Sequence, residues 1–151
     1  MFRGLSTVSL DAKGRMAIPS RYRDRLSQAG NNELVVTISP LDRCLLLYPL
    51  FEWELIEVKL QELPEFDTLT TRRTKQMLRG YAADLEVDAQ GRVLLPQKHR
   101  EFANLHKQVA VLGQGNKFEL WDEEAWNEQR DRWLEGVVQD EPSEALRRLA
   151  L

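Results

Sequence analysis

The stretch Leu10-Asp11-Ala12-Lys13-Gly14-Arg15-Met16-Ala17-Ile18-Pro19-Ser20-Arg21-Tyr22-Arg23 has a second copy, which runs from Val87 to Arg100. At a spacing of 77 residues the two copies carry identical residues at the pairs Asp11/Asp88, Ala12/Ala89, Gly14/Gly91, Arg15/Arg92, Pro19/Pro96 and Arg23/Arg100. An internal repeat constrains the architecture before any local propensity is considered. The sequence therefore predicts two related half-domains within one chain.

Each copy has the pattern of a strand, a tight turn, a returning strand and a helix. Asp at the first position and Gly at the fourth position favour a type I turn, so each copy resembles a β-hairpin. The predicted hairpin-shaping residues are Asp11, Gly14, Asp88 and Gly91. Pro19 and Pro96 follow the returning strand, where proline suits the start of a helix because its missing N–H would be unpaired there.

The remaining elements also occur in pairs. Branched and apolar runs predict a strand pair at residues 34–38 and 44–48, and a second at 109–112 and 117–121, with Gly113 and Gly115 at the turn of the second pair. Apolar periodicity and capping residues predict the remaining helices. These helices are expected at residues 20–27 with a stop at Gly30, 49–63, 68–79 with Asp67 or Thr68 as the cap, 96–102, 123–138 and 143–149.

These patterns predict an α+β fold of tandem duplicated β-hairpin/helix half-domains with added helices. The first half-domain with its closing helix is expected at residues 1–63, and a connecting basic helix at 64–79. The second half-domain with its closing helix is expected at 80–138, and a C-terminal tail helix at 139–151.

Composition indicates a soluble globular protein, since 42% of residues are hydrophobic and 30% are charged. No apolar run approaches the roughly 20 residues needed to span a membrane. The first residues lack the apolar core of a signal peptide, so we expect a cytoplasmic protein with no membrane partner. The single cysteine, Cys44, is expected to be a buried small hydrophobe.

Charge is distributed unevenly along the chain, although the formal net charge is only −3. Basic residues dominate the first 25 positions, whereas acidic residues dominate positions 122–144. The basic ones are Arg3, Lys13, Arg15, Arg21, Arg23 and Arg25. Such separation predicts one face suited to a polyanion and another turned to solvent.

Catalytic chemistry has little support in the sequence. The two histidines, His99 and His106, and the single cysteine have no metal-ligand spacing. Asp11 and Asp88 could be a carboxylate pair, but turn formation explains both fully. We therefore expect no enzymatic activity, no metal and no cofactor.

Arg15 and Arg92 remain to be explained. One interpretation is an ion pair with the aspartate of the same turn. The other is DNA contact, because arginine can donate two parallel hydrogen bonds to guanine and a two-stranded ribbon fits the major groove. We favour DNA contact for Arg15 because Arg3, Lys13, Arg21 and Arg23 surround it in the sequence. For Arg92 both interpretations stay open, because acidic residues precede it.

Together these residues resemble the MraZ family of bacterial regulators, which are encoded at the head of the cell-division and cell-wall gene cluster. The resemblance rests on both copies of the repeat, on Met1-Phe2-Arg3-Gly4 and on Asn116-Lys117-Phe118-Glu119-Leu120-Trp121. The second copy departs from the first where Gln90 replaces Lys13 and where Gln97-Lys98-His99 replaces Ser20-Arg21-Tyr22.

The resemblance implies an AbrB-like swapped-hairpin fold of the double-split β-α-β type, present twice per chain. It also implies a ring-shaped homo-oligomer, usually an octamer, that binds short direct repeats in double-stranded promoter DNA and represses its own gene cluster at the nucleoid. Carried over by position, Arg15 is the principal DNA contact with Arg3 and Lys13 nearby, and Arg92 is the corresponding residue of the second copy.

A second hypothesis is a protein-interaction ring or antitoxin-like scaffold without specific DNA readout. AbrB-type hairpins also serve as dimerisation modules, and the acidic helices after Asp122 could bind a partner. Charge reversal at Arg15 separates the two hypotheses, because a DNA contact would be lost while the oligomer stays intact.

Overall fold

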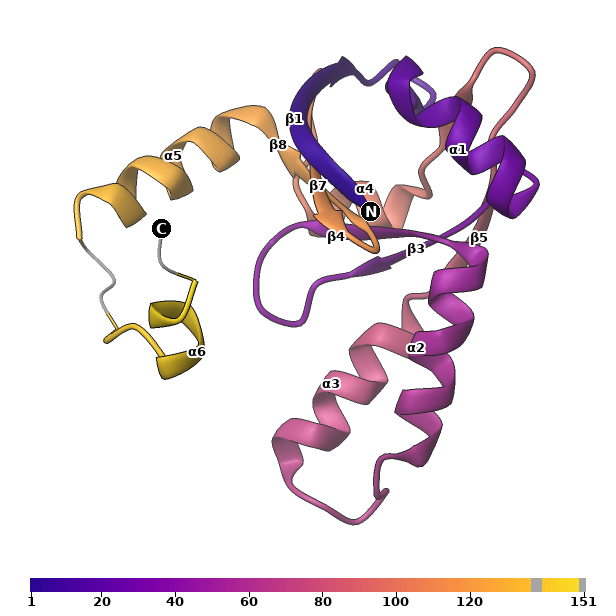
Figure 1. Cartoon of the computed structure of the whole chain (residues 1–151). Helices are drawn as coiled ribbons and strands as arrows, with labels where there is room; N and C mark the ends of the chain where they lie inside the picture. The colour runs from indigo at the N-terminus through magenta and orange to yellow at the C-terminus, as the bar shows by residue number, and fades with distance from the viewer. Residues whose placement is uncertain (137–139, 150–151) are drawn as a thin grey trace.

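The structure is a computed structural model that describes residues 1–136 and 140–149. Its centre is a six-stranded antiparallel sheet in the order β1-β7-β8-β4-β3-β5 (Figure 1). The strands of this sheet are β1 (Phe2–Ser9), β3 (Glu33–Ile38), β4 (Leu45–Pro49), β5 (Ala83–Glu86), β7 (Gln108–Gly115) and β8 (Phe118–Asp122). A separate two-stranded ribbon pairs β2 (Arg15–Ala17) with β6 (Arg92–Leu94).

The two halves of the chain exchange strands. Each half keeps its own hairpin, β3 with β4 and β7 with β8, as the sequence predicts. The first strand of each half, however, pairs with the other half, β1 with β7 and β5 with β3. The ribbon also takes one strand from each half. This arrangement confirms the duplicated swapped-hairpin fold.

The predicted hairpin of each copy is present only next to its turn, where the Asp11 N–H donates to the Arg15 carbonyl and the Asp88 N–H donates to the Arg92 carbonyl. In the first copy, β1 and β2 meet at the bridge between Leu10 and Met16. The rest of β1 lies along β7 from Phe2/Gly115 to Ser9/Gln108. The turn reverses the chain as predicted, but the strands on either side of it find their partners in the other half.

Six helices occupy the described residues, namely α1 (Ser20–Gly30), α2 (Leu50–Glu62), α3 (Leu69–Gly80), α4 (Gln97–Phe102), α5 (Glu123–Leu134) and α6 (Glu144–Arg147). The two repeated prolines stand directly before α1 and α4, as predicted. Thr68 caps α3 by accepting a hydrogen bond from the Thr71 N–H at 3.1 Å, which confirms one of the two predicted caps.

Three predicted helix ends differ from the structure. Helix α1 continues through Gly30, and Asn31 takes the left-handed conformation that ends it, with φ of 51°. Helix α5 ends at Leu134 because Gly136 is left-handed, with φ of 75°, and not at residue 138. Residues 137–139 lie outside the described part of the chain. Helix α6 is one turn long and therefore shorter than the predicted 143–149.

The prediction of a turn at Gly113 and Gly115 is wrong for Gly113, which lies within β7, and right for Gly115, which ends β7 with φ of 80°. Gly4 of β1 lies opposite Gly113 in the ladder. A Cβ on Gly113 would lie 2.4 Å from the backbone nitrogen of Arg3. Glycine at position 113 therefore permits the close approach of β1, and the turn falls at Gly115 and Asn116, where the Gln114 N–H donates to the Lys117 carbonyl at 2.8 Å.

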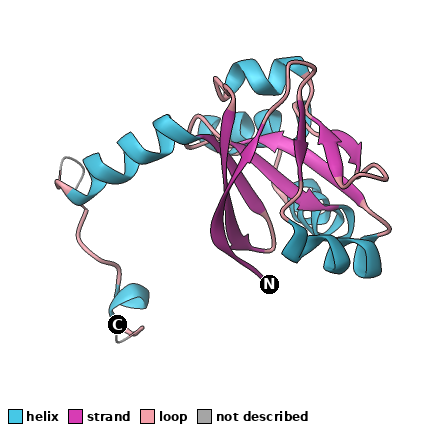
Figure 2. Ribbon diagram, turned by 90° about the horizontal axis from the view of Figure 1, so that it is seen from above, coloured by secondary structure: helices cyan, strands magenta, loops and turns pink. Residues whose placement is uncertain are grey.

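Alternation of side chains along the strands gives the sheet two buried faces. One face packs against the ribbon and α1 in a cluster that includes Met16, Leu26, Val36, Val93 and Phe118. The other face is covered by α2, α3 and α5 in a second cluster. Figure 2 shows helices on either side of the strands. The fold is therefore three layers, with the ribbon on one side of the sheet and the longer helices on the other.

Helices α2 and α3 form a pair that projects from the body, and α5 extends away from the edge of the sheet (Figure 1). The buried Thr37 anchors α3 to the sheet, because its hydroxyl donates to the carbonyl of Leu78 at 2.7 Å.

Cys44 is buried as expected, and its burial raises the pKa of the thiol. In the part of the chain that is described, no helix is both long enough and apolar enough to cross a membrane.

The exchange of strands makes Gly113 a sensitive position. We expect Gly113→Ala to lower the free energy of unfolding by about 1–3 kcal/mol, because the added methyl group would force β1 away from β7. Gly80→Ala is the matched control, since nothing lies within 4 Å of its Cβ position and alanine favours a helix. Urea denaturation of both variants measures the effect, and equal stability of the two would contradict this account of the strand contact.

Candidate nucleic-acid interface

The two turns of the repeat have the same hydrogen bonds. In the first, the carboxylate of Asp11 accepts from the backbone N–H groups of Lys13 and Arg15, both at 2.9 Å. In the second, Asp88 accepts from Gln90 and Arg92 at the same distance. Both aspartates are thus bound by the backbone of their own turn, which supports the shaping role proposed from the sequence.

The glycines complete these turns. The N–H of Gly14 donates to the carbonyl of Asp11 at 3.0 Å, and that of Gly91 donates to the carbonyl of Asp88 at 2.9 Å. Both glycines have positive φ, 91° and 75°, a conformation that other residues rarely adopt. The chain therefore presents two rigid turns of the same shape.

An arginine from the opposite half packs against each glycine. A Cβ on Gly14 would lie 2.7 Å from the guanidinium carbon of Arg100, and a Cβ on Gly91 would lie 2.5 Å from Nε of Arg23. These arginines also donate from Nε to backbone carbonyls, Arg23 to Ile18 at 2.9 Å and Arg100 to Leu95 at 3.0 Å. We call the two contacts the crossed clamps.

One of the two arginines in the crossed clamps, Arg23, is a residue that the sequence analysis assigned to DNA binding. Arg23 is half-buried, and its guanidinium joins the first α1 turn to the second repeat. Arg100 is the equivalent residue, which sequence reasoning matched to Arg23 without giving it a role. The sequence signal for a shared role of the two arginines is their equal spacing, because each follows the glycine of its own copy by nine residues.

The ribbon brings Arg15 and Arg92 onto one face. In the register of β2 and β6, Arg15 lies opposite Leu94 and Arg92 lies opposite Ala17. Side chains alternate along a strand, so these four residues share one face, and Met16 and Val93 point into the core. The outer face of the ribbon therefore carries two arginines, with an Asp turn beside each.

The electrostatics agree with this proximity. The pKa of Asp11 is lowered chiefly by the hydrogen bond from the Arg15 N–H, and that of Asp88 chiefly by the N–H of Arg92. The positive charges of both arginines lower each of these pKa values further. The two copies thus form one charged surface and not two separate ones.

The two arginines differ in their partners. Nε of Arg92 lies 3.7 Å from the Asp88 carboxylate, so Arg92 takes part in the ion pair that the sequence left open. For Arg15, no carboxylate lies within ion-pairing distance in residues 1–136 and 140–149. Its guanidinium is therefore the freer of the two.

The other predicted basic residues fall into two places. Lys13 is exposed on the first turn, next to the ribbon. Arg3 lies on β1, where it is exposed and where its carbonyl accepts from the hydroxyl of Tyr22. Arg21 donates to the Ser6 hydroxyl at 2.8 Å and lies 4.8 Å from the centre of the Tyr22 ring. Arg3 and Arg21 therefore belong to a surface formed by β1 and α1.

The described residues contain no cluster of three or more His, Cys, Asp or Glu side chains that could bind a metal. His106 has a structural partner, because its Nδ1 lies 3.1 Å from the Asp122 carboxylate that caps α5. The candidate functional surface is the ribbon with its two turns, which carries Arg15 and Arg92 on one face.

The fold and this surface define a duplicated AbrB-like protein with a swapped-hairpin ribbon. A family model described as "MraZ protein, putative antitoxin-like" matches residues 1–76 and again residues 77–149, in agreement with the duplication. The chain belongs to the MraZ family, which confirms the resemblance seen in the sequence.

Relatives match over nearly their whole length, and each is named "Transcriptional regulator MraZ". The protein of Marinomonas sp. is 51% identical over 152 residues that cover 100% of both chains. That of Hydrogenovibrio crunogenus is 48% identical over 150 residues, which cover 99% of this chain and 98% of the relative. That of Pseudomonas aeruginosa is 52% identical over 139 residues, which cover 92% and 91%.

The lowered pKa values of Asp11 and Asp88 lead to a pH prediction. An aspartate whose pKa is lower in the folded state stabilises the fold above its unfolded pKa of about 3.9 and loses this effect as pH falls through the folded value. We expect the Asp11→Asn/Asp88→Asn variant to be less stable than the parent at pH 7, with the difference disappearing as the pH falls below about 4. Urea denaturation across this range measures it, and a pH-independent difference would contradict the ionic contribution.

Proposed function

We propose that this chain is a transcriptional regulator that binds double-stranded DNA through the β2–β6 ribbon. The observation that carries the proposal is the pair Arg15 and Arg92 on one outer face of the ribbon, between two rigid turns. The names of its relatives support regulation of transcription. The catalytic alternative has no such support.

A two-stranded ribbon is narrow enough to enter the major groove of B-form DNA. There an arginine can donate two hydrogen bonds to the O6 and N7 atoms of guanine, and a lysine can contact phosphate. Arg15 is the better base-reading candidate because its guanidinium has no carboxylate partner in the described residues. Lys13, Arg3 and Arg21 supply the flanking phosphate contacts.

The geometry changes the roles of two arginines. Arg23 acts through the crossed clamps and supports the turn at Gly91, so we assign it to positioning and not to direct DNA contact. Arg92 lies on the outer face but is ion-paired with Asp88, which partly neutralises its charge. It therefore contributes less to DNA binding than Arg15 does. Leu94, which is 52% exposed on the same face, offers an apolar contact for a thymine methyl group.

We further propose that the targets are short direct repeats in the promoter of its own division and cell-wall gene cluster, which the protein represses at the nucleoid. One ribbon makes too few contacts for tight and specific binding. Several ribbons on one oligomer can engage successive repeats, and each added contact is effectively intramolecular. Oligomerisation is therefore part of the proposed mechanism.

We propose a ring of eight chains as the oligomer. Large apolar side chains stand exposed at the projecting helices, a pattern that marks protein contacts. On α5 they are Trp133, 63% exposed, and Leu134, 72% exposed. On α2 they are Leu55 and Val58, both 58% exposed. Contacts between α5 of one chain and a neighbouring chain would bury these surfaces and leave the ribbons free.

The DNA contact is tested by charge reversal. We expect Arg15→Glu to weaken binding to the native upstream duplex by about 1–3 kcal/mol or more and to reduce the salt dependence, with a smaller loss for Arg92→Glu. Lys59→Glu, on the opposite side of the sheet, is the matched control and should bind normally. Fluorescence anisotropy with native and scrambled duplexes over a salt series measures both effects.

The same experiment can overturn the assignment. If Arg15→Glu binds DNA like the parent while its oligomer is broken, Arg15 is structural. If the parent binds native and scrambled duplexes equally and weakly, the ribbon does not read sequence. The second hypothesis, an antitoxin-like interaction ring, then takes precedence, and the acidic surface of α5 becomes the candidate partner site.

Assembly is tested separately from DNA binding. We expect Trp133→Glu/Leu134→Glu to dissociate the oligomer, because two charges would replace apolar area at the contact. Leu69→Glu is the control, since this side chain is 66% exposed on α3 and not on α5. Sedimentation velocity gives the mass of each species, and an unchanged mass for the double variant would exclude α5 as the contact.

A further inference from the structure

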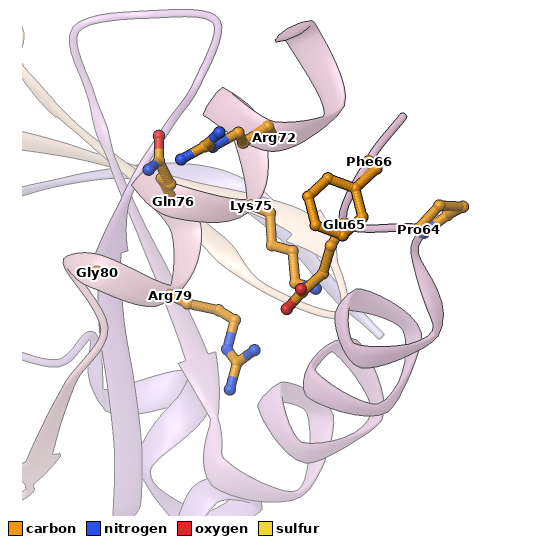
Figure 3. A pocket seen from close by; sticks show the side chains of 8 residues that line it. All are labelled: Pro64, Glu65, Phe66, Arg72, Lys75, Gln76, Arg79 and Gly80. Atoms are coloured by element: carbon orange, nitrogen blue, oxygen red, sulfur yellow. The ribbon is translucent and has the colours of Figure 1, made fainter. Parts of the chain in front are cut away.

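A hollow of about 510 Å³ lies between α3 and the segment that joins it to α2. Its volume falls within the range of small-molecule sites. The residues that line it are Pro64, Glu65, Phe66, Arg72, Lys75, Gln76, Arg79 and Gly80 (Figure 3). None of the roles assigned above to the ribbon or to α5 uses this hollow.

The wall formed by α3 is strongly basic. Arg72, Lys75 and Arg79 follow each other at three and four residues, which places them on one face of the helix. No carboxylate in the described residues lies within ion-pairing distance of any of the three. Arg79 instead donates to the side-chain amide of Gln61 at 3.2 Å. Three cations that form no ion pair create a site for an anion, and arginine binds phosphate oxygens with two parallel donors.

The opposite wall supplies an aromatic ring. Phe66 is 97% exposed, the largest exposed fraction among the large hydrophobic side chains of the described residues. A free phenylalanine at the rim of a basic hollow offers a flat surface on which a planar base can stack. The site therefore combines cations that suit the phosphates of a ligand with an aromatic ring that suits a planar base.

Glu65 is the acidic residue of the lining, and its side chain extends toward Lys75 (Figure 3). It lowers the positive charge of the hollow without cancelling it. A carboxylate beside a phosphate site can also accept hydrogen bonds from sugar hydroxyls, which is a common mode of ribose recognition. From the cations, the aromatic ring and this carboxylate, we infer that the hollow binds a nucleotide, with its phosphates on α3 and its base on Phe66.

The hollow is separate from the proposed DNA surface. The residues that line it come from α3 and from the segment between α2 and α3, and none of them belongs to β2, β6 or the two Asp turns. The two sites therefore share no residue. A concave site of this volume also fits a compact ligand better than the phosphate backbone of a duplex.

The test is isothermal titration calorimetry of the full chain with ATP, GTP and pyrophosphate. We expect saturable binding of the nucleotides, weaker binding of pyrophosphate, and at least a tenfold loss of affinity for all three in Arg72→Glu/Lys75→Glu. Phe66→Ala should lose affinity for the nucleotides and keep that for pyrophosphate. Lys98→Glu, an exposed cation on α4, is the control and should bind like the parent.

Each other outcome overturns the inference. Absence of saturable nucleotide binding, or equal affinity in Arg72→Glu/Lys75→Glu, excludes the site. If pyrophosphate binds as tightly as ATP and Phe66→Ala changes nothing, the hollow is a phosphate site without base recognition. If the double variant weakens duplex binding while nucleotides do not bind, α3 is a DNA contact. Circular dichroism melting of each variant checks that these surface changes leave the fold intact, and Arg79→Gln repeats the test with a milder change.

Discussion

The structure depends on an exchange between its two halves. Each half-domain lacks a neighbour for its hairpin, and the first strand of the other half supplies it. The crossed clamps repeat this dependence at the level of single side chains, because Arg23 and Arg100 each support a glycine that belongs to the other copy. Each turn therefore combines hydrogen bonds inside its own copy with the packing of an arginine from the opposite half. Folding of the core and assembly of the charged surface are therefore one event.

This coupling explains how a small surface stays rigid. The ribbon has three paired positions, too few to be stable as an isolated hairpin. Its inner residues are anchored in the core, and the turns beside it are held by backbone hydrogen bonds to the carboxylates of Asp11 and Asp88. Such fixed geometry lowers the ordering cost when a ligand binds.

Much of this architecture was predictable from the sequence. The repeat predicted two halves and the shapes of both turns, and branched runs predicted the β3–β4 and β7–β8 pairs. The local pattern could not predict the exchange, since the same residues would also suit a hairpin within one copy, and only resemblance to a family indicated swapping. Contacts over long sequence separations explain the other errors. Gly113 was interpreted as a turn residue because its strand partner, β1, lies more than a hundred residues away.

Single side chains were harder to assign than elements. Arg15 and Arg23 are both half-buried basic residues of the first copy, yet Arg15 lies on the outer face of the ribbon and Arg23 contacts the opposite half. Periodicity cannot separate them, because the difference arises from tertiary packing. The hollow beside α3 shows the same limit, since its basic helix was visible in the sequence but the nearness of Phe66 was not.

The two strands of the ribbon are not equivalent, and this fixes the direction in which it would lie on DNA. They come from copies related by a local pseudo-twofold axis, and DNA also has twofold symmetry. A perfectly symmetric ribbon would therefore bind a site equally well in either orientation. Here the two arms are unequal, because Lys13 corresponds to Gln90, Ala17 to Leu94, and only Arg92 is paired with its aspartate. In the proposed complex this inequality gives each ribbon a polarity along the duplex, as head-to-tail repeats require and palindromes do not.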